Sequence, residues 1–244
     1  MSVECLLTLM AVATMLLLLF QAAPGTRARS LFGHLANPAT APFLAAAGCA
    51  TVLFAMLTAV IMVAPDAAAA LDEAVSSTIA PHRRPWLLSA FLWLTTLGTG
   101  AALSAVVVTA TGFLWVNRGG MIILPLWITF GGAEATVWAT KYLVGRARPL
   151  FLDGVASAVS PSFPSAHATG AAAVLGFVAF MVGRGRPDRH ERFEVACCTV
   201  ELIALIGLSR VFLGMHFATD VIGGFLIGSA WLSAGIAAVR AAYR

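Results

Sequence analysis

Charged residues are scarce in this 244-residue chain: Asp, Glu, Lys and Arg make up only 11% of it, whereas 60% of its residues are hydrophobic. A soluble domain carries about 25% charged residues, so this composition excludes a water-soluble globular enzyme. It also excludes a disordered chain, because disorder requires much charge and little apolar surface. The mean hydropathy of +0.91 instead indicates an integral membrane protein.

Cysteine and lysine are also rare, and neither forms a pattern. The four cysteines all lie inside apolar runs, without the spacing of metal ligands or of a disulfide framework, so we interpret them as small apolar residues. Lys141 is the single lysine, and the other basic residues are arginines. The net charge of +4 does not predict a nucleic-acid partner, because the charges stand at the ends of apolar runs, as in membrane loops.

Long apolar runs divide the chain. A transmembrane helix needs about 20 mostly apolar residues, and seven runs approach that length. The sixth is the weakest, because it is short and carries Glu201. We find no internal repeat, and we predict an all-α integral membrane protein with an N-terminal hydrophobic helix and connector at 1–40 and one transmembrane domain at 41–244. The runs are Leu6–Ala23, Ala41–Ala64, Trp86–Val116, Met121–Val144, Ala166–Gly183, Phe193–Leu208 and Val211–Val239.

The first run has two interpretations. Small residues and a proline follow it, as in a secretory signal peptide. However, Glu4 precedes it and Arg27 and Arg29 follow it, which favours a retained helix with its N-terminus outside. Cleavage would leave six spans.

The basic residues predict the orientation. Alternate connectors place nine of them on one side and five on the other, with Arg210 near the second side. The positive-inside rule then puts the side with nine in the cytoplasm, and residues 141–167 face outward from the plasma or inner membrane. The nine are Arg27, Arg29, Arg118, Arg184, Arg186, Arg189, Arg192, Arg240 and Arg244, and the five are Arg83, Arg84, Lys141, Arg146 and Arg148.

Three polar clusters stand at span ends, where an ionisable residue is a functional candidate by default. The first is Lys141 with Arg148, followed by Pro149. Residues seven apart share a helical face, so the two cations are expected to point to one place. On this cluster alone, a basic helix end that snorkels to the interface is the simpler interpretation.

The second cluster is the segment from Pro161 to His167, Pro-Ser-Phe-Pro-Ser-Ala-His, directly before an apolar run. Proline followed by serine at such a boundary predicts a helix start, whose free backbone N–H groups favour an anion. Ser165 adds a hydroxyl, and His167 can exchange a proton near neutral pH. The alternative is a helix cap with an interfacial histidine.

The third cluster is Ser209-Arg210, His216 and Asp220, at the start of the last run. His216 and Asp220 are four apart, hence neighbours on a helix face. A carboxylate that accepts a hydrogen bond from one imidazole nitrogen leaves the other free as a nucleophile or base. Arg210 offers a planar fork suited to phosphate oxygens. The three clusters together predict a site that binds and transfers a phosphoryl group without a metal.

The ordered pattern K-x6-R-P, P-S-x-H, S-R-x5-H-x3-D resembles that of the type 2 phosphatidic acid phosphatase superfamily. The resemblance covers roughly residues 41–244 and implies a six-helix transmembrane phosphatase core. It implies that His216 attacks phosphorus to give a phosphohistidine, that Asp220 orients it, and that His167 protonates the leaving oxygen and then activates water. It implies that the phosphoryl oxygens are held by Lys141, Arg148, Ser165 and Arg210.

One position departs from the family pattern, which has glycine where this chain has Ala166. We expect alanine to be tolerated, because a helix start does not require positive φ. The family works without a metal or another cofactor, so none is expected here.

The implied activity is hydrolysis of lipid phosphates or diphosphates at the extracytoplasmic face. Polyprenyl diphosphate, phosphatidate and phosphatidylglycerol phosphate remain candidate substrates, with a polyprenyl-diphosphate phosphatase as the narrower hypothesis. Two alternatives remain open from sequence: a lipid phosphotransferase with the same phosphohistidine chemistry, and a non-enzymatic membrane transporter or scaffold.

Overall fold

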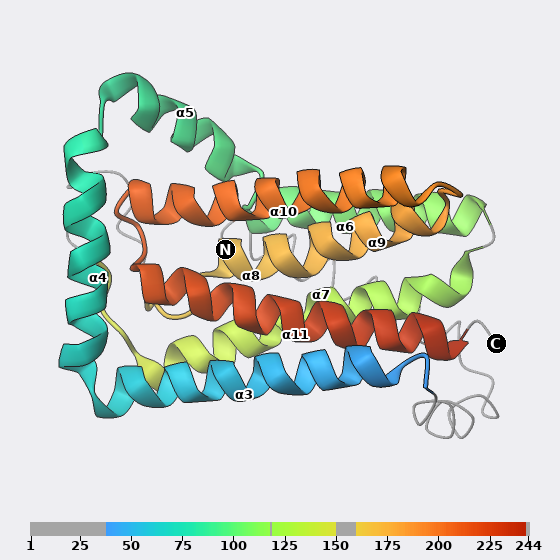
Figure 1. Cartoon of the computed structure of the whole chain (residues 1–244), viewed down its shortest axis with the longest axis horizontal. Coiled ribbons are helices and arrows are strands. Elements are labelled where there is room, and N and C mark those ends of the chain that lie inside the picture. The colour runs from blue at the N-terminus through green and yellow to red at the C-terminus, as the bar shows by residue number, and fades with distance from the viewer. Residues whose placement is uncertain (1–37, 118, 150–159, 243–244) are drawn as a thin grey trace.

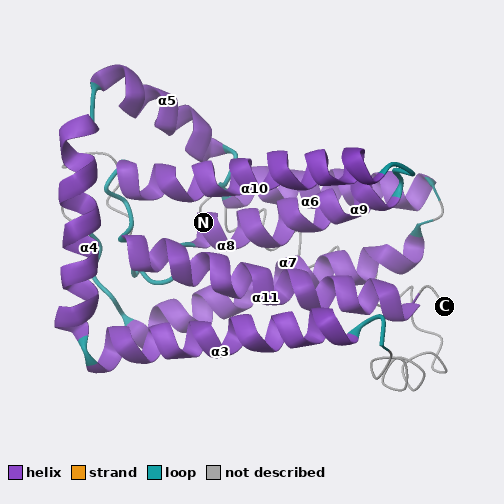
Figure 2. Cartoon of the chain, in the orientation of Figure 1, coloured by secondary structure: helices purple, strands orange, loops and turns teal. Residues whose placement is uncertain are grey.

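The computed structural model describes residues 38–117, 119–149 and 160–242, and all regular elements in these ranges are helical (Figures 1 and 2). The predicted all-α fold is therefore confirmed. The elements are α3 (Ala41–Val63), α4 (Pro65–Ile79), η1 (Ala80–His82), α5 (Pro85–Thr96), α6 (Gly100–Val116), α7 (Gly120–Val144), α8 (Ala166–Gly170), η2 (Ala171–Leu175), α9 (Gly176–Arg184), α10 (Arg189–Phe212) and α11 (Ala218–Ala242).

Most of the long helices run along one direction and form a bundle (Figure 1). Within the described residues, five helical stretches are long and apolar enough to cross a membrane, or six when the bent pair α5 and α6 counts as one span. This number fits the predicted six-helix core. The predicted helix at Leu6–Ala23 and the boundary at residue 40 depend on residues outside the described ranges, so the two-part division stays a prediction.

The predicted span Trp86–Val116 is two helices rather than one. Helices α5 and α6 meet at an angle of 41°. Thr99 caps the start of α6, because its side chain accepts a hydrogen bond from Ala102 N at 3.2 Å. A polar cap inside an otherwise apolar run restarts the helix in a new direction.

The last two predicted spans divide at a different place. The sequence pattern ended one span at Leu208 and began the next at Val211, but α10 continues to Phe212 and α11 begins at Ala218. Between them Gly214 has φ +65, a left-handed conformation that glycine adopts without steric cost. His216 therefore lies in a turn before α11 and not on the helix itself.

Helix α4 connects the first two spans and runs across one end of the bundle (Figure 1). Pro65 opens it and Asp66 lies in its first turn, both favourable at a helix N-terminus. It packs against α3, α10 and α11. The hydropathy pattern did not reveal this helix, because its alanine-rich sequence is too short and too polar to be a span.

Helix α11 is packed closely against α8. A Cβ added to Gly228 would lie 2.5 Å from the Thr169 carbonyl oxygen, and one added to Gly224 would lie 2.7 Å from the Ser165 carbonyl oxygen. A larger residue at either position would push the helices apart. This close approach lets Ser165 N donate a hydrogen bond to the Asp220 carbonyl oxygen at 3.0 Å.

Candidate active site

The elements that carry the three sequence clusters meet at the bundle end that α4 crosses (Figure 1). Each residue enters from an element end: Lys141 from the last turn of α7, His167 from the first turn of α8, and Arg210 from the last turn of α10. Gly145, with φ +63, ends α7 and turns the chain into the segment that carries Arg148. The bundle thus gathers the seven predicted site residues at one end.

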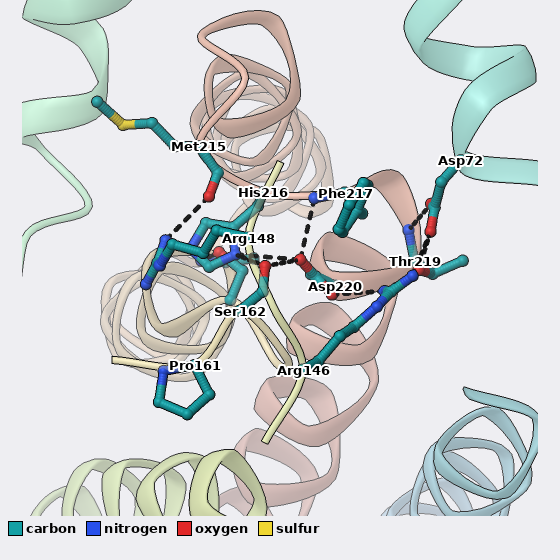
Figure 3. Close-up of polar contacts among 12 residues, drawn as sticks. Asp72, Arg146, Arg148, Pro161, Ser162, Met215, His216, Phe217, Thr219 and Asp220 are labelled. Carbon is teal, nitrogen blue, oxygen red and sulfur yellow. Dashed lines mark hydrogen bonds and ion pairs between the residues drawn. The ribbon is translucent and has the colours of Figure 1, made fainter. Parts of the chain in front are cut away.

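His216 and Asp220 form the centre of the cluster (Figure 3). Their side chains are 3% and 0% exposed, and His216 Nδ1 lies 3.3 Å from Asp220 Oδ2. The same carboxylate oxygen accepts hydrogen bonds from Phe217 N at 2.9 Å and from the Ser162 hydroxyl. Ser162 Oγ also lies 3.4 Å from His216 Nδ1. The carboxylate is therefore fixed on one side of the imidazole.

The other imidazole nitrogen faces a cation. His216 Nε2 lies 3.2 Å from Arg148 Nη1, a donor only. Hydrogen bonding therefore assigns the proton to Nδ1, toward Asp220, and the lone pair to Nε2. Burial lowers the pKa of His216 to about 4, although the hydrogen bond to Asp220 opposes this shift. The ring is neutral at pH 7, as a nucleophile requires.

Arg148 is held in place by the chain around the site. Its Nε donates to the Ser160 carbonyl oxygen at 2.9 Å, and its Nη1 donates to the Met215 carbonyl oxygen at 2.9 Å. Burial lowers the pKa of this guanidinium, but an arginine retains its charge in proteins. The fork is thus fixed beside His216 Nε2.

Lys141 is buried, at 2% exposure, and its ammonium contacts the backbone. Its Nζ donates to the carbonyl oxygens of Pro161 at 2.5 Å and Ser162 at 3.2 Å. An ammonium has three donors, so one remains for a bound anion. Lys141 therefore also fixes the loop that carries Ser162, a contact that the sequence did not reveal.

Arg210 has an unsatisfied donor. Its Nη1 donates to Thr95 Oγ1 at 2.8 Å, but its buried Nε has no hydrogen-bond partner in the described residues. A buried donor without a partner is costly and uncommon in native proteins. A phosphoryl oxygen at this position would satisfy it.

Ser165 and His167 occupy the start of α8, as the sequence predicted. Ser165 is the N-cap, and its hydroxyl oxygen accepts a long contact of 3.5 Å from Ala168 N. His167 is partly buried. A Cβ on Gly98, at the bend between α5 and α6, would lie 3.2 Å from the His167 ring. The bend therefore leaves room for this imidazole.

Four further residues belong to the cluster and were missed. Ser162 lies inside the second motif region, so its proximity to Ser165 was the available signal. Arg146 and Thr219 likewise lie inside the first and third motif segments, whereas Asp72 is distant from all three and joins them only in the folded chain. The four are Asp72, Arg146, Ser162 and Thr219.

Metal ligands do not gather here. Among the residues that the structure describes, no group of three or more His, Cys, Asp or Glu side chains lies close enough to hold a metal ion.

A family comparison decides the relationship: the model of the PAP2 superfamily matches residues 121–244. The chain belongs to this superfamily. The matched region contains all seven site residues that the sequence predicted. Membership confirms the predicted family and, with the relatives below, the class of enzyme, which is a phosphatase.

Named relatives of this PAP2 protein include a phosphatidylglycerophosphatase B from Bacillus subtilis, 32% identical over 165 residues that make up 67% of this chain and 80% of that protein. A decaprenylphosphoryl-5-phosphoribose phosphatase from Mycobacterium tuberculosis is 34% identical over 149 residues, 54% of this chain and 75% of that protein.

Two crystal structures share the PAP2 fold. The transmembrane PAP2 type phosphatidylglycerolphosphate phosphatase from Bacillus subtilis has a TM-score of 0.70 and 29% identity, covering 78% of this chain and 94% of that one. LpxE from Aquifex aeolicus has a TM-score of 0.51 and 25% identity, covering 68% and 93%. These matches agree with a multi-pass membrane protein.

Proposed function

We propose that this PAP2 protein hydrolyses lipid phosphates without a metal, through a phosphohistidine on His216. One observation carries the proposal: the Nδ1 side of the imidazole is held at Asp220, while Nε2 faces the fixed guanidinium of Arg148. The ring is oriented, neutral and directed at the place where phosphoryl oxygens would be bound. These are the requirements for nucleophilic attack on phosphorus.

The reaction has two steps. His216 Nε2 attacks phosphorus, the phosphorus–oxygen bond to the lipid breaks, and the leaving oxygen takes a proton from His167. His167, now neutral, then takes a proton from water, whose oxygen attacks phosphorus and breaks the phosphorus–nitrogen bond. Inorganic phosphate leaves, and both histidines return to their first state. Asp220 stabilises the positive charge that forms on His216 in the first step.

The remaining predicted residues bind the transferred group. Arg148 and the orphaned Nε of Arg210 are donors to its oxygens, and the negative charge that they neutralise would otherwise repel the attacking nitrogen. Ser165 contributes its hydroxyl and the start of α8 contributes backbone N–H groups. Lys141 supplies the third cation and holds the neighbouring loop.

The substrate we propose is a lipid whose head group ends in a phosphate or diphosphate. The cluster lies at a helix-bundle end, where a head group at the membrane surface meets it while its chains stay in the bilayer. The phosphatidylglycerophosphatase and decaprenylphosphoryl-5-phosphoribose phosphatase names of the relatives support this class. Phosphatidylglycerol phosphate is therefore the first substrate to test.

We further propose that the site faces the extracytoplasmic side of the plasma or inner membrane. The described arginines at the opposite bundle end support this orientation by the positive-inside rule. They are Arg184, Arg186, Arg189, Arg192 and Arg240.

The test is phosphate release in detergent with a metal chelator present. Phosphatidylglycerol phosphate, phosphatidate and farnesyl diphosphate are compared for the wild type, for His216→Ala and for the control His190→Ala. We expect release from at least one lipid, retained in the control and absent in His216→Ala. An acid-labile radiolabel on the wild-type protein, missing from His216→Ala, would identify the phosphohistidine.

Several results would contradict the proposal. Release that the chelator abolishes would refute the metal-free mechanism. Equal rates for His216→Ala and the wild type would refute the nucleophile, and label transferred to an added alcohol in place of water would identify a phosphotransferase.

A further inference from the structure

Arg146 joins two buried carboxylates that are far apart in the sequence (Figure 3). Its Nη1 lies 2.7 Å from Asp220 Oδ1, and its Nη2 lies 2.7 Å from Asp72 Oδ2. The Asp72 and Asp220 side chains are 1% and 0% exposed. A planar guanidinium suits this bridge, because it presents donors in a fixed fork.

Asp72 also binds the start of α11. Its Oδ1 accepts a hydrogen bond from Thr219 N at 2.9 Å, and its Oδ2 accepts one from Thr219 Oγ1 at 2.8 Å. Asp72 thus caps the N-terminus of α11 from a different helix, α4. Since Thr219 precedes Asp220 directly, this cap fixes the turn of helix that carries the catalytic carboxylate.

Arg146 itself has a defined position. Its Cζ lies 4.4 Å from the centre of the Phe217 ring, and its Nη1 also donates to Thr219 Oγ1 at 2.7 Å. Phe217 and Thr219 lie on either side of the α11 start. The guanidinium is therefore held between α4 and α11 by stacking as well as by charge.

We propose that Asp72 and Arg146 are positioning residues that hold the Asp220 carboxylate toward His216 and so make the active site depend on the placement of α4. This inference rests on the proposed function. It assigns α4, which contributes no residue to the predicted chemistry, a part in it.

Arg146 is expected to position Asp220 because the two carboxylate oxygens have different partners. Oδ1 is occupied by Arg146, and Oδ2 is left for His216, Ser162 and the Phe217 amide. Without Arg146 only the bonds of Ser162 and the Phe217 amide to Oδ2 still hold the carboxylate, so it turns more easily away from the imidazole. A misplacement of about 1 Å far from the chemistry can cost about a hundredfold in rate.

Charge provides a second readout. Arg146 offsets the negative charges of Asp72 and Asp220, so its loss makes His216 easier to protonate and loss of Asp72 makes it harder. The other charged or titratable groups that act on His216 stay unchanged in these variants. They are Arg148, His167 and Arg210.

The experiment measures kcat, KM and the pH dependence of kcat/KM for Arg146→Gln, Arg146→Lys and Asp72→Asn in the full-length protein. Glu73→Gln is the matched control, because Glu73 is the exposed neighbour of Asp72 on the same helix. We expect kcat to fall about 10- to 100-fold for Arg146→Gln with little change in KM. Arg146→Lys keeps the charge but not the planar fork, so its kcat is expected to lie between those of Arg146→Gln and the wild type. The kcat of Glu73→Gln is expected to match that of the wild type.

The acid limb of the kcat/KM pH profile distinguishes a positioning role of Arg146 and Asp72 from a general loss of folding in the variants. It is expected to move to higher pH in Arg146→Gln, to move to lower pH in Asp72→Asn, and to stay in place in Arg146→Lys. Histidine NMR, with the His216 signal assigned by His216→Gln, measures the same protonation without activity. If Asp72→Asn does not fold, Arg146→Lys and Arg146→Gln still test whether Arg146 positions the Asp220 carboxylate.

Folded Arg146→Gln with a wild-type kcat and an unmoved His216 titration would overturn the inference. Its failure is distinguishable from failure of the proposed function. Wild-type protein that releases no phosphate from any lipid refutes the function, while the NMR titration of the variants still tests the coupling.

Discussion

Two histidine–carboxylate pairs in this chain have the same spacing and almost the same geometry. His190 Nδ1 lies 3.2 Å from Glu194 Oε1, and His216 Nδ1 lies 3.3 Å from Asp220 Oδ2, each pair four residues apart. The first pair is 75% and 60% exposed at one bundle end, whereas the second is 3% and 0% exposed at the other. Spacing alone therefore does not identify a catalytic pair.

The surroundings make the difference. The buried pair is fixed by bonds from distant parts of the chain, including Arg148, Ser162 and Arg146. Near the exposed pair, Arg186 pairs with Glu191 only five residues away. Exposed ion pairs of this kind contribute about 0–1 kcal/mol. Burial and long-range contacts thus distinguish the His216–Asp220 pair from the solvated one.

The strongest way to break this comparison is to neutralise each carboxylate in turn. We expect Asp220→Asn to lower kcat by about 10⁴-fold, because the amide no longer orients the imidazole or stabilises its positive charge. Glu194→Gln is expected to leave kcat unchanged. Initial rates of phosphate release measure both, and a similar loss in the two variants would show that the buried pair is not special.

The arginines give the next largest contrast. Arg148→Gln is expected to lower kcat/KM by about 10²- to 10³-fold, since it removes a donor fixed beside His216 Nε2. Arg186→Gln removes an exposed cation at the opposite end and is expected to have no effect on rate. Equal effects in the two would mean that only net charge matters, a result that a salt titration would reveal.

The pH dependence sharpens the comparison further. Because burial lowers the pKa of His216 from 6.5 to about 4, the neutral nucleophile persists down to that pH. We expect kcat/KM to show no His216 limb between pH 5 and 7 and to fall about tenfold per unit below about pH 4. A limb near pH 6.5 that follows His216 would contradict this.

Protonation of His216 is also expected to change the free energy of unfolding. The unfolded chain binds it at the ordinary pKa of 6.5, above the folded value of about 4. The folded state is therefore expected to lose stability as the pH falls from 6.5 toward 4. Thermal unfolding across this interval measures the loss. It also identifies the pH range in which the protein stays folded, so that rates of phosphate release can be compared there.

The smallest expected effect is at Ala166. Helix α8 begins at this residue, directly after its Ser165 cap, so the backbone is helical there and alanine fits without strain. We expect Ala166→Gly to change kcat/KM less than threefold, an effect on the order of 0.5 kcal/mol. A tenfold gain would show that the family glycine serves a purpose that alanine cannot.

The sequence predicted the apolar spans and the three motif clusters, because both leave a local pattern. The ends of α7, and of the continuous stretch from the start of α8 to the end of α9, fell within a residue of the predicted ones. The break between α10 and α11 was misplaced, because the turn at Gly214 lies inside a continuous apolar run. Asp72 and Arg146 were missed, because their contact joins residues 74 positions apart and no short window contains it.

Helix α11 supplies Asp220 and is also the last helix that the structure describes. The other site residues precede it in the chain, and Asp72, near the beginning of the described residues, is bonded to Thr219. If the proposed mechanism holds, the site therefore stays incomplete until α11 has been inserted and has packed against α4 and α8. Until then Asp72 lacks Thr219, its partner in α11, and His216 lacks the carboxylate that orients it in the proposed mechanism.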